Sequence, residues 1–371
     1  MALNRRFSGR MSALIAAPTL RSAQSLHACA PSRRQRSKCG RRVQAAAAES
    51  SAPPEVSDST TASNTSVPLA CPVCLRPFRV DGGSRCVAGG WSHTTEGHVL
   101  TALSLAHARL TCAACARSYN QSSRGAFTDL TLSGSGAGVF RDAARPTSTS
   151  LFENPLISFA YERGWRRSFS WAGFPGEEPE FVTAQNWMAS AAGGVLLDAS
   201  CGSGLFTRRF AVSNRYAAVI GLDYSEAMLL EADERMREGM PSSTPITLIR
   251  ADVSRLPFAT GSIDAVHAGA ALHCWPAPGQ AMAEVSRVLK PGGVFVASTF
   301  LDPTSPLGEL IGDATVLPLA QALSAQRSTS YRWWNEQELR DLCTMVGLTG
   351  FERIRTRQFI QFTAKKPGRV I

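Results

Sequence analysis

The chain has 371 residues, 44% of them hydrophobic, and it carries 39 basic against 29 acidic side chains. Residues 1–48 hold nine Arg, one Lys and no acid, so the net charge of +10 belongs to this leader and the rest balances at 29 basic and 29 acidic residues. The length allows two folded units, and the lack of any long apolar run excludes an integral membrane protein, leaving a soluble chain or one attached to a surface.

The beginning of the chain has the composition of a targeting sequence. It is rich in Ser, Ala and Arg, and its only apolar run, residues 13–17, is too short for a membrane span or a signal-peptide core. We therefore predict a transit peptide over residues 1–45, and the Ser and Ala bias favours the chloroplast over the mitochondrion. A basic nucleic-acid-binding arm is the alternative interpretation. Residues 46–67 have hardly any large apolar side chain and are predicted to be a disordered linker.

Two C-x-x-C pairs follow this linker. Cys71 and Cys74 (CPVC) are separated by 37 residues from Cys112 and Cys115 (CAAC). Cysteines at positions i and i+3 of a tight turn converge on one metal, so the two pairs match the ligand set of a tetrahedral zinc site. We expect this zinc to be structural, because a module over residues 68–133 has little core of its own and metal binding supplies folding energy. Disulfides and a redox-active C-x-x-C are the alternatives.

A second linker and a helical region come next. Residues 134–150 are rich in Gly, Ser and Thr, residues 151–169 are aromatic and amphipathic, and a further helical pattern runs to about residue 192. Five aromatic side chains form the stripe on the first helical segment: Phe152, Phe159, Tyr161, Trp165 and Phe169. Ordinary core packing is the first interpretation of this stripe, and acceptor binding is the alternative.

The most informative segment is GVLLDASCGSGLFTRRF, residues 194–210. Three apolar residues lead into Asp198, a small turn with Gly202 and Gly204 follows, and helical spacing then begins, which indicates a buried strand, a tight turn and a helix start. In a doubly wound sheet such a turn lies at the carboxyl end of a central strand, where ligands bind. Because a G-x-G alone fits a dinucleotide site equally well, the continuation of the chain decides.

Four more runs have strand character, at residues 216–223, 246–257, 263–270 and 289–300, the last containing a Pro-Gly-Gly turn. The first run ends in Asp223, 19 residues after Gly204, about where such folds place a carboxylate for a ribose diol. The second run carries Asp252 at the end of its strand.

The end of the chain predicts a lid and an edge hairpin. Residues 301–334 interrupt the alternation of strands and helices with Pro, Gly and Ser, which is typical of a lid over a binding site. A helix over residues 335–346 follows. The alternating patterns of residues 351–357 and 359–364 predict two antiparallel strands that close the sheet.

Five sequence blocks in fixed order carry a resemblance to a known family: LLDASCGSG, GLDYS, IRADVSRLPF, SIDAVHAGAALHCW and VLKPGGVF. Over roughly residues 180–365 the chain resembles the class I S-adenosylmethionine-dependent methyltransferases, specifically the type 11 branch that includes the ubiquinone and menaquinone methyltransferases. The stretch from residue 151 through HCWPAP (residues 273–278) is also similar to a plant and algal group of chloroplast methyltransferase-like proteins. The resemblance implies an enzyme whose residues 151–371 form a doubly wound, Rossmann-like α/β sheet of seven strands.

The resemblance also implies which residues bind S-adenosylmethionine: Asp198, Gly202, Gly204, Asp223, Tyr224, Asp252 and Val253. The first three would face the methionine part. Asp223 would accept both hydroxyl protons of the ribose, and Asp252 would accept from the adenine amino group with Val253 against the ring. A turn or N-cap role is the alternative for each acid.

One position departs from the family pattern D-x-G-C-G-x-G. Its first glycine is Ser200 in this chain. We expect the turn to survive, because serine is small, and we expect an ordinary negative φ at this residue.

His273, which follows the fourth strand in the sequence LHCW, is the candidate catalytic base. Methyl transfer is an in-line displacement that depends mainly on alignment. When the acceptor is a phenol, a catechol or an enol carbon, a base must also remove a proton, and an imidazole suits this work near neutral pH. A structural histidine hydrogen-bonded within the loop is the alternative.

The pattern CPVC, LTCAAC, Tyr119 and G-x-F-x-D-L is similar to zinc ribbons fused to, or partnered with, some RNA and protein methyltransferases. Three functions follow. The first is a methyltransferase of the chloroplast stroma or plastoglobule, acting on a small apolar or aromatic, quinone-like acceptor, with association to a membrane or lipid-droplet surface. The second is an RNA methyltransferase that recruits nucleic acid through the ribbon. The third is a protein that binds S-adenosylmethionine without turnover.

Overall fold

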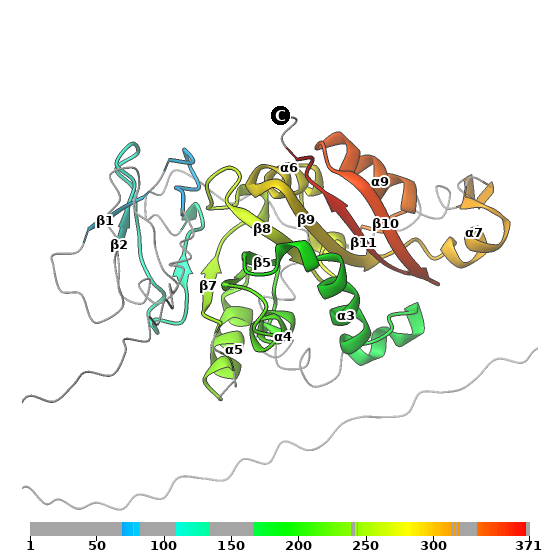
Figure 1. Cartoon of the computed structure of the whole chain (residues 1–371), viewed down its shortest axis with the longest axis horizontal. Helices are drawn as coiled ribbons and strands as arrows, with labels where there is room; N and C mark the ends of the chain where they lie inside the picture. The colour runs from blue at the N-terminus through cyan, green and yellow to red at the C-terminus, as the bar shows by residue number, and fades with distance from the viewer. Residues whose placement is uncertain are drawn as a thin grey trace, which may run out of the picture. The chain divides into compact units, whose positions relative to one another are not determined.

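The structure is a computed structural model, and it describes residues 69–76, 78–81, 109–133, 166–238, 242, 244–313, 315–316, 318–319 and 332–368 (Figure 1). The predicted transit peptide (1–45) and the predicted linkers (46–67 and 134–150) lie outside the described residues. Most of the aromatic segment over residues 151–169 does too. Residues 61–371 belong to one compact unit.

The centre of the fold is a mainly parallel sheet of eight strands with the order β10-β11-β9-β8-β5-β6-β7-β4. Its strands are β4 (Thr128–Asp129), β5 (Val195–Ala199), β6 (Ala218–Asp223), β7 (Ile246–Arg250), β8 (Ile263–Ala268), β9 (Leu289–Phe300), β10 (Thr349–Thr356) and β11 (Phe359–Lys365). From β5 the chain builds outward through β6 and β7, then crosses back to β8 on the other side of β5, so the strand order reverses at β5. Without β4, these strands confirm the predicted doubly wound α/β fold class.

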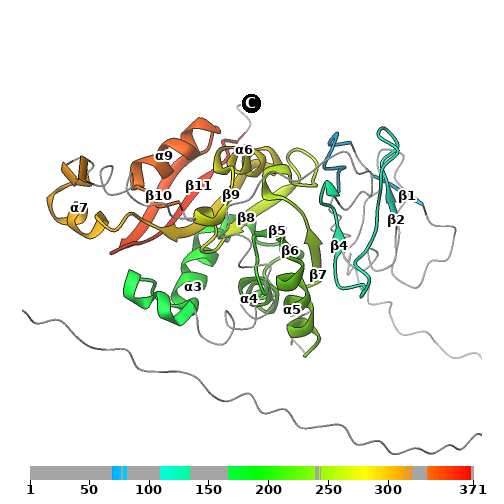
Figure 2. The same cartoon turned by 180° about the vertical axis from the view of Figure 1, so that it is seen from behind.

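Helices cover both faces of this sheet (Figures 1 and 2). They are α3 (Glu177–Trp187), α4 (Leu205–Val212), α5 (Glu226–Arg237), α6 (Pro278–Val288) and α9 (Glu336–Met345). A further helix, α7 (Ser305–Ile311), follows β9 and lies to one side of the sheet (Figure 1). Residues of α3 and α4 share an apolar core with one face of the sheet, whereas residues of α6 and α9 share a core with the other face. None of the helices within the described part of the chain has the length and apolar character to cross a membrane.

Local sequence explains where these elements begin and end. All five residues of β5 are buried, as expected for a strand with helices on both sides. Ser225 caps α5 by accepting from the Met228 amide at 3.3 Å. Asn335 and Glu338 form a capping box that starts α9. The antiparallel pair β10 and β11 at the sheet edge confirms the predicted hairpin.

The cysteine-containing segment forms a small sheet of its own and then joins the large one. Its three antiparallel strands are β1 (Arg79–Asp81), β2 (Arg109–Thr111) and β3 (Ser118–Tyr119). The chain then leaves the small sheet and forms β4, which pairs in parallel with β7, with Thr128 beside Ile249 and Asp129 beside Arg250. The sequence analysis did not predict this eighth strand, because two residues carry no detectable strand periodicity.

Four short 3₁₀ helices complete the described chain: η4 (Arg166–Ala172), η5 (Ala189–Ala191), η6 (Val253–Arg255) and η7 (Leu272–Cys274). η6 and η7 follow the carboxyl ends of β7 and β8. This location places them at the edge of the sheet where the strand order reverses, and they form part of the site described below.

Candidate active site

A crevice opens at the carboxyl ends of β5, β6, β7 and β8 and encloses about 1120 Å³ of space, part of it open to solvent. Its lining includes seven of the predicted site residues: Asp198, Gly202, Asp223, Tyr224, Asp252, Val253 and His273. These residues are far apart in the chain and come together because parallel strands end at the same edge of the sheet. The crevice lies at the reversal of strand order, where ligands bind in open α/β sheets.

Asp198 lies near the end of β5 and is only 2% exposed. Its Oδ2 accepts from the Thr207 hydroxyl at 2.6 Å, and its Oδ1 lies 2.8 Å from Nδ1 of His267. Both carboxylate oxygens are therefore oriented by side chains, which fixes the carboxylate at the base of the crevice. His267 was missed by the sequence analysis, although it is the β8 residue directly beside Asp198 in the sheet register. Only the strand order could have pointed to this pair.

The turn after β5 departs from expectation at Ser200. We predicted an ordinary negative φ there, but the angle is +62°, in the left-handed region. This prediction is therefore wrong: Ser200 adopts a backbone conformation that favours glycine, which costs a serine about 1 to 2 kcal/mol. The Ser200 Oγ accepts from Nε1 of the buried Trp275 at 3.0 Å, and this hydrogen bond offsets part of the cost.

The two glycines of this turn have different surroundings. A Cβ added to Gly202 would meet nothing within 4 Å, so its backbone faces the open crevice. Gly204 does not line the crevice; it precedes α4 with φ of +78°, and an added Cβ would lie 3.2 Å from the Cβ of Ala232 on α5. Gly202 is therefore placed to admit a ligand, whereas Gly204 permits close packing of two helices.

Asp223 ends β6 and is held by backbone amides of two segments. Its Oδ2 accepts from the Gly202 amide and its Oδ1 from the Ser225 amide, both at 2.8 Å. Burial raises the pKa of this carboxyl, against the opposing effect of these amides. A desolvated carboxylate in a fixed orientation is well suited to accept hydrogen bonds from a pair of ligand hydroxyls.

The third acid is an N-cap that also lies in the crevice. Asp252 lines the crevice, and its Oδ1 accepts from the Ser254 amide at 2.8 Å as the N-cap of η6. Val253 follows it into the lining. Tyr224 lines the crevice on the β6 side, and the Arg250 guanidinium lies 5.4 Å from the centre of its ring.

His273 lies on η7, is 9% exposed and lines the crevice on a segment distant in sequence from these acids. Its Nδ1 is 3.3 Å from Oγ1 of Thr299, and its ring packs edge-on against Phe300. The structural role and the position in the crevice therefore coexist. Phe169 also lines the crevice, which places one member of the predicted aromatic stripe at the site; the other members lie outside the described residues.

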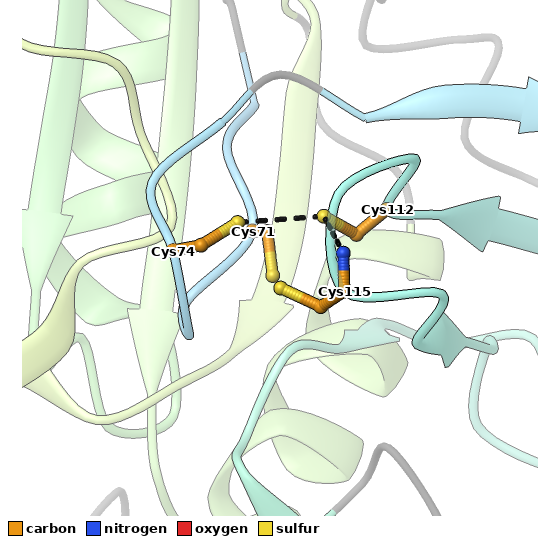
Figure 3. Close-up of side chains that lie close together, drawn as sticks. All are labelled: Cys71, Cys74, Cys112 and Cys115. Atoms are coloured by element: carbon orange, nitrogen blue, oxygen red, sulfur yellow. Dashed lines mark hydrogen bonds between the residues drawn. The ribbon is translucent and has the colours of Figure 1, made fainter.

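The four predicted metal ligands form a second cluster (Figure 3). The sulfurs of Cys71, Cys74, Cys112 and Cys115 all lie within 4.8 Å of one another, and the Cys74 and Cys112 sulfurs are 3.5 Å apart. In a tetrahedral site with Zn–S bonds of about 2.3 Å, sulfurs are separated by roughly 3.8 Å. The thiols therefore converge to nearly the spacing that a zinc ion requires.

The two C-x-x-C turns are built alike. In the first turn the Val73 amide points at the Cys71 sulfur, and in the second the Cys115 amide points at the Cys112 sulfur, both at 3.4 Å. Each turn is followed by a residue with positive φ, Leu75 at +60° and Ala116 at +53°. Amides directed at sulfur stabilise thiolates, so the donor set and its surroundings fit a metal site with four cysteine ligands.

Comparisons with known proteins agree with this geometry. A family model described as a methyltransferase domain matches residues 197–297. Two proteins of Arabidopsis thaliana, both named as uncharacterized chloroplastic methyltransferases, are each 42% identical to the chain; the alignments cover 81% of this chain and 79% and 78% of theirs. A demethylmenaquinone methyltransferase of Desulfitobacterium hafniense is 28% identical over 53% of this chain and 76% of its own length.

The coverage of these relatives differs in an informative way. An alignment over 81% of the chain is longer than residues 151–371, so the similarity to the Arabidopsis proteins extends into the cysteine-containing region. The bacterial relative covers 53% of the chain, less than that span. The Arabidopsis proteins are thus similar over more of the chain than the bacterial enzyme is.

Proposed function

The chain belongs to the S-adenosylmethionine-dependent methyltransferases, and from this premise we propose that it transfers the methyl group to a small apolar or aromatic, quinone-like acceptor in the chloroplast. Asp223 would accept from the ribose hydroxyls and Asp252 from the adenine amino group, with Val253 against the ring. Gly202 would let the methionine part approach the backbone. When bound, S-adenosylmethionine supplies an electrophilic methyl group on a sulfonium centre.

The observation that carries the acceptor proposal is the character of the crevice wall. Among the described residues that line it there is no Lys or Arg, and the charged side chains are the three acids. Aromatic and aliphatic side chains such as Phe169, Phe206 and Trp275 make up much of the remainder. A wall of this kind favours an uncharged, apolar acceptor and offers no counter-charge to a phosphate.

The chain's own groups would contribute positioning and one proton transfer. Holding donor and acceptor in line contributes about 7 to 11 kcal/mol in well-aligned reactions. The apolar wall would exclude water from the reacting atoms. His273 would take the proton of an acceptor hydroxyl or carbon acid.

We further infer that Cys71, Cys74, Cys112 and Cys115 hold a structural zinc ion. The convergence of the four sulfurs and the backbone amide directed at a sulfur in each turn support this proposal. Elemental analysis of the purified chain is expected to find one zinc per polypeptide. A chain that folds with no bound metal would overturn the assignment.

For location, the names of the Arabidopsis relatives and the basic leader both support the chloroplast. The similarity to a demethylmenaquinone methyltransferase supports a quinone-like acceptor. We propose that the chain meets this acceptor in the stroma or at a plastoglobule or membrane surface. Import of a fluorescent protein fused to residues 1–48 tests the first point, with expected accumulation in plastids and not in mitochondria.

Radiolabelled methyl transfer tests the reaction itself. The full chain is incubated with methyl-tritiated S-adenosylmethionine and either plastid lipid extract or plastid RNA, with Asp223→Ala as the control. Label in the lipid fraction that Asp223→Ala abolishes is the expected result. Label in RNA would instead support the RNA methyltransferase, and cofactor binding with no label in either fraction would support a protein without turnover.

A further inference from the structure

We propose that the cysteine module (described residues 69–76, 78–81 and 109–133) stabilises the conformation of the cofactor site. In this proposal Arg255 and Arg250 are positioning residues that couple metal binding to S-adenosylmethionine binding. The coupling rests on the proposed structural zinc and on the family's cofactor. Two cofactor-binding loops, one after β6 and one after β7, are each attached to this module by an arginine.

Arg255 attaches the loop that carries Asp252 and Val253. It ends η6, and its guanidinium donates to the backbone carbonyls of Pro72 and Val73, the latter at 2.6 Å. Those two carbonyls belong to the residues between Cys71 and Cys74, inside the first metal-binding turn. The conformation of that turn, which a bound metal would fix, therefore determines where the guanidinium finds its acceptors.

Arg250 attaches the loop that carries Asp223. It ends β7, and its Nη1 donates to Asp129 of the module at 3.1 Å. Its Nε donates to the backbone carbonyl of Tyr224 at 2.9 Å, and its guanidinium lies over the Tyr224 ring. One side chain thus joins the module to the residue that directly follows Asp223.

Backbone pairing reinforces both attachments. The Leu130 amide donates to the Arg250 carbonyl at 2.8 Å, and the Ala70 amide donates to the Pro257 carbonyl at 2.9 Å. Without β4, β7 would be an edge strand with unpaired backbone groups. The module therefore pairs with the β7 edge of the sheet at Arg250 and again at Pro257, the two ends of the loop after β7.

Apolar contacts lie on both faces of this edge. Leu110, Tyr119 and Leu130 of the module belong to the same core cluster as Ile249 of β7 and the buried apolar residues of the following loop. In a separate cluster, Phe127 packs with Leu229 and Ala232 of α5. A rearrangement of the module would thus disturb the surroundings of both loops.

The loop after β7 also has an independent attachment to α6, which limits the expected effect. The Leu256 amide donates to Glu284 at 2.8 Å, and Arg287 donates to the carbonyls of Leu256 and Phe258. We therefore expect loss of the Arg255 contacts to loosen the loop without unfolding it.

Coupling of this kind is reciprocal. If bound zinc tightens the binding of the cofactor by some factor, the cofactor must tighten the binding of zinc by the same factor. A purely structural metal with no link to the crevice would show no such dependence. This reciprocity separates a positioning role from general stabilisation.

The experiment compares the full wild-type chain with Arg255→Ala and with the matched control Arg237→Ala, whose guanidinium pairs with Asp233 along α5 and is mostly exposed. Calorimetry measures the affinity for S-adenosylhomocysteine, and a chromophoric chelator measures zinc affinity with and without that ligand. We expect Arg255→Ala to keep one zinc per chain, to bind the ligand about tenfold more weakly and to show a smaller dependence of zinc affinity on ligand than the wild type, because the Arg250 contacts remain. Arg237→Ala should match the wild type.

Arg255→Lys guards against a folding artefact, because it keeps the charge and can reach one carbonyl at a time. Its ligand affinity should lie between the wild type and Arg255→Ala, and hydrogen exchange at residues 251–258 should follow the same order. Wild-type ligand affinity in a folded Arg255→Ala, or zinc affinity of the wild type that ignores the ligand, would overturn the coupling. A wild-type chain that binds the ligand but methylates nothing would count against the proposed acceptor and leave the coupling standing.

Discussion

In both the crevice and the cysteine module, backbone amides point at a carboxylate or a sulfur, but the sheets that carry these groups differ in size. In the crevice, amides of Gly202 and Ser225 point at the carboxylate of Asp223; in the module, amides of Val73 and Cys115 point at cysteine sulfurs. The crevice sits at the middle of an eight-stranded sheet with apolar cores on both faces. The sheet within the module has only three short strands. Substitutions in the crevice should therefore mainly lower the affinity for the cofactor, whereas substitutions in the module should mainly lower the free energy of unfolding.

Removal of a metal ligand should have the largest effect on this comparison. If the proposed zinc is bound, Cys112→Ser is expected to lose it and to lower the free energy of unfolding by about 5 kcal/mol or more, because structural zinc contributes about 10 to 16 kcal/mol in small modules. Scanning calorimetry with parallel metal analysis measures both. The control Cys343→Ser, at a buried position of α9, should lower stability while keeping the metal. Equal melting temperatures for Cys112→Ser and the wild type would show that the stability of the protein does not depend on the cysteine ligands of the module.

Loss of the carboxylate proposed to bind the ribose should have the next largest effect. Asp223→Ala is expected to weaken S-adenosylmethionine binding by about 100-fold, because charge-assisted hydrogen bonds are worth about 1.5 to 3 kcal/mol each. Calorimetric titration measures the affinity, and circular dichroism follows the fold. The melting temperature should change far less than in Cys112→Ser. Retained affinity in this variant would show that another group binds the ribose.

The effect of pH on cofactor affinity should be smaller than that of Asp223→Ala and larger than that of substitutions in the Ser200 turn. Since burial raises the pKa of Asp223, ionising this carboxyl costs the free protein stability as the pH rises through the folded-state pKa. On acidification the carboxylate is protonated earlier than an ordinary Asp with a pKa near 3.9. Affinity should therefore fall as the pH is lowered, by up to about tenfold per unit below the folded-state pKa. Calorimetry over a series of pH values from neutral towards the acid limit of the folded protein tests this, and Asp223→Asn, which cannot ionise, should lack this component.

The smallest effect should come from the strained turn. The Ser200 and Trp275 hydrogen bond predicts an interaction energy of about 1 kcal/mol in a double-mutant cycle of Ser200→Gly and Trp275→Phe. In the Trp275→Phe background, Ser200→Gly should stabilise the protein by about 1 kcal/mol, because glycine accepts a positive φ without strain. Chemical denaturation measures all four variants. Additive changes would mean that the hydrogen bond does not support the turn.

Much of the crevice could be predicted from the sequence because its residues follow directly from strand ends. Asp198, Asp223 and Asp252 each come at or just after the end of an apolar run, and parallel strands bring such ends together. The cysteine cluster was predictable for a similar reason, since spacing within each pair fixes the turn. Whether these residues act in binding and catalysis stays a prediction for the experiments above.

Other features could not be read from local patterns. His267 pairs with Asp198 through the register of two neighbouring strands, and the two residues are 69 positions apart in the chain, so no local spacing reveals the pair. The positive φ of Ser200 is supported by Trp275 from a different loop. The role of Gly204 in packing depends on the approach of α5.

The sequence by itself determined the α/β fold class, the order of its strands along the chain and the two clusters of polar residues at strand ends and tight turns, because hydrophobic periodicity and turn chemistry are local. Only the tertiary structure decided that Thr128 and Asp129 pair with β7 and that the arginines at the end of β7 and of η6 link the module to the loops after β6 and β7. Pairing at a sheet edge depends on which segment reaches the unpaired backbone groups, and a two-residue strand carries no pattern that could announce it.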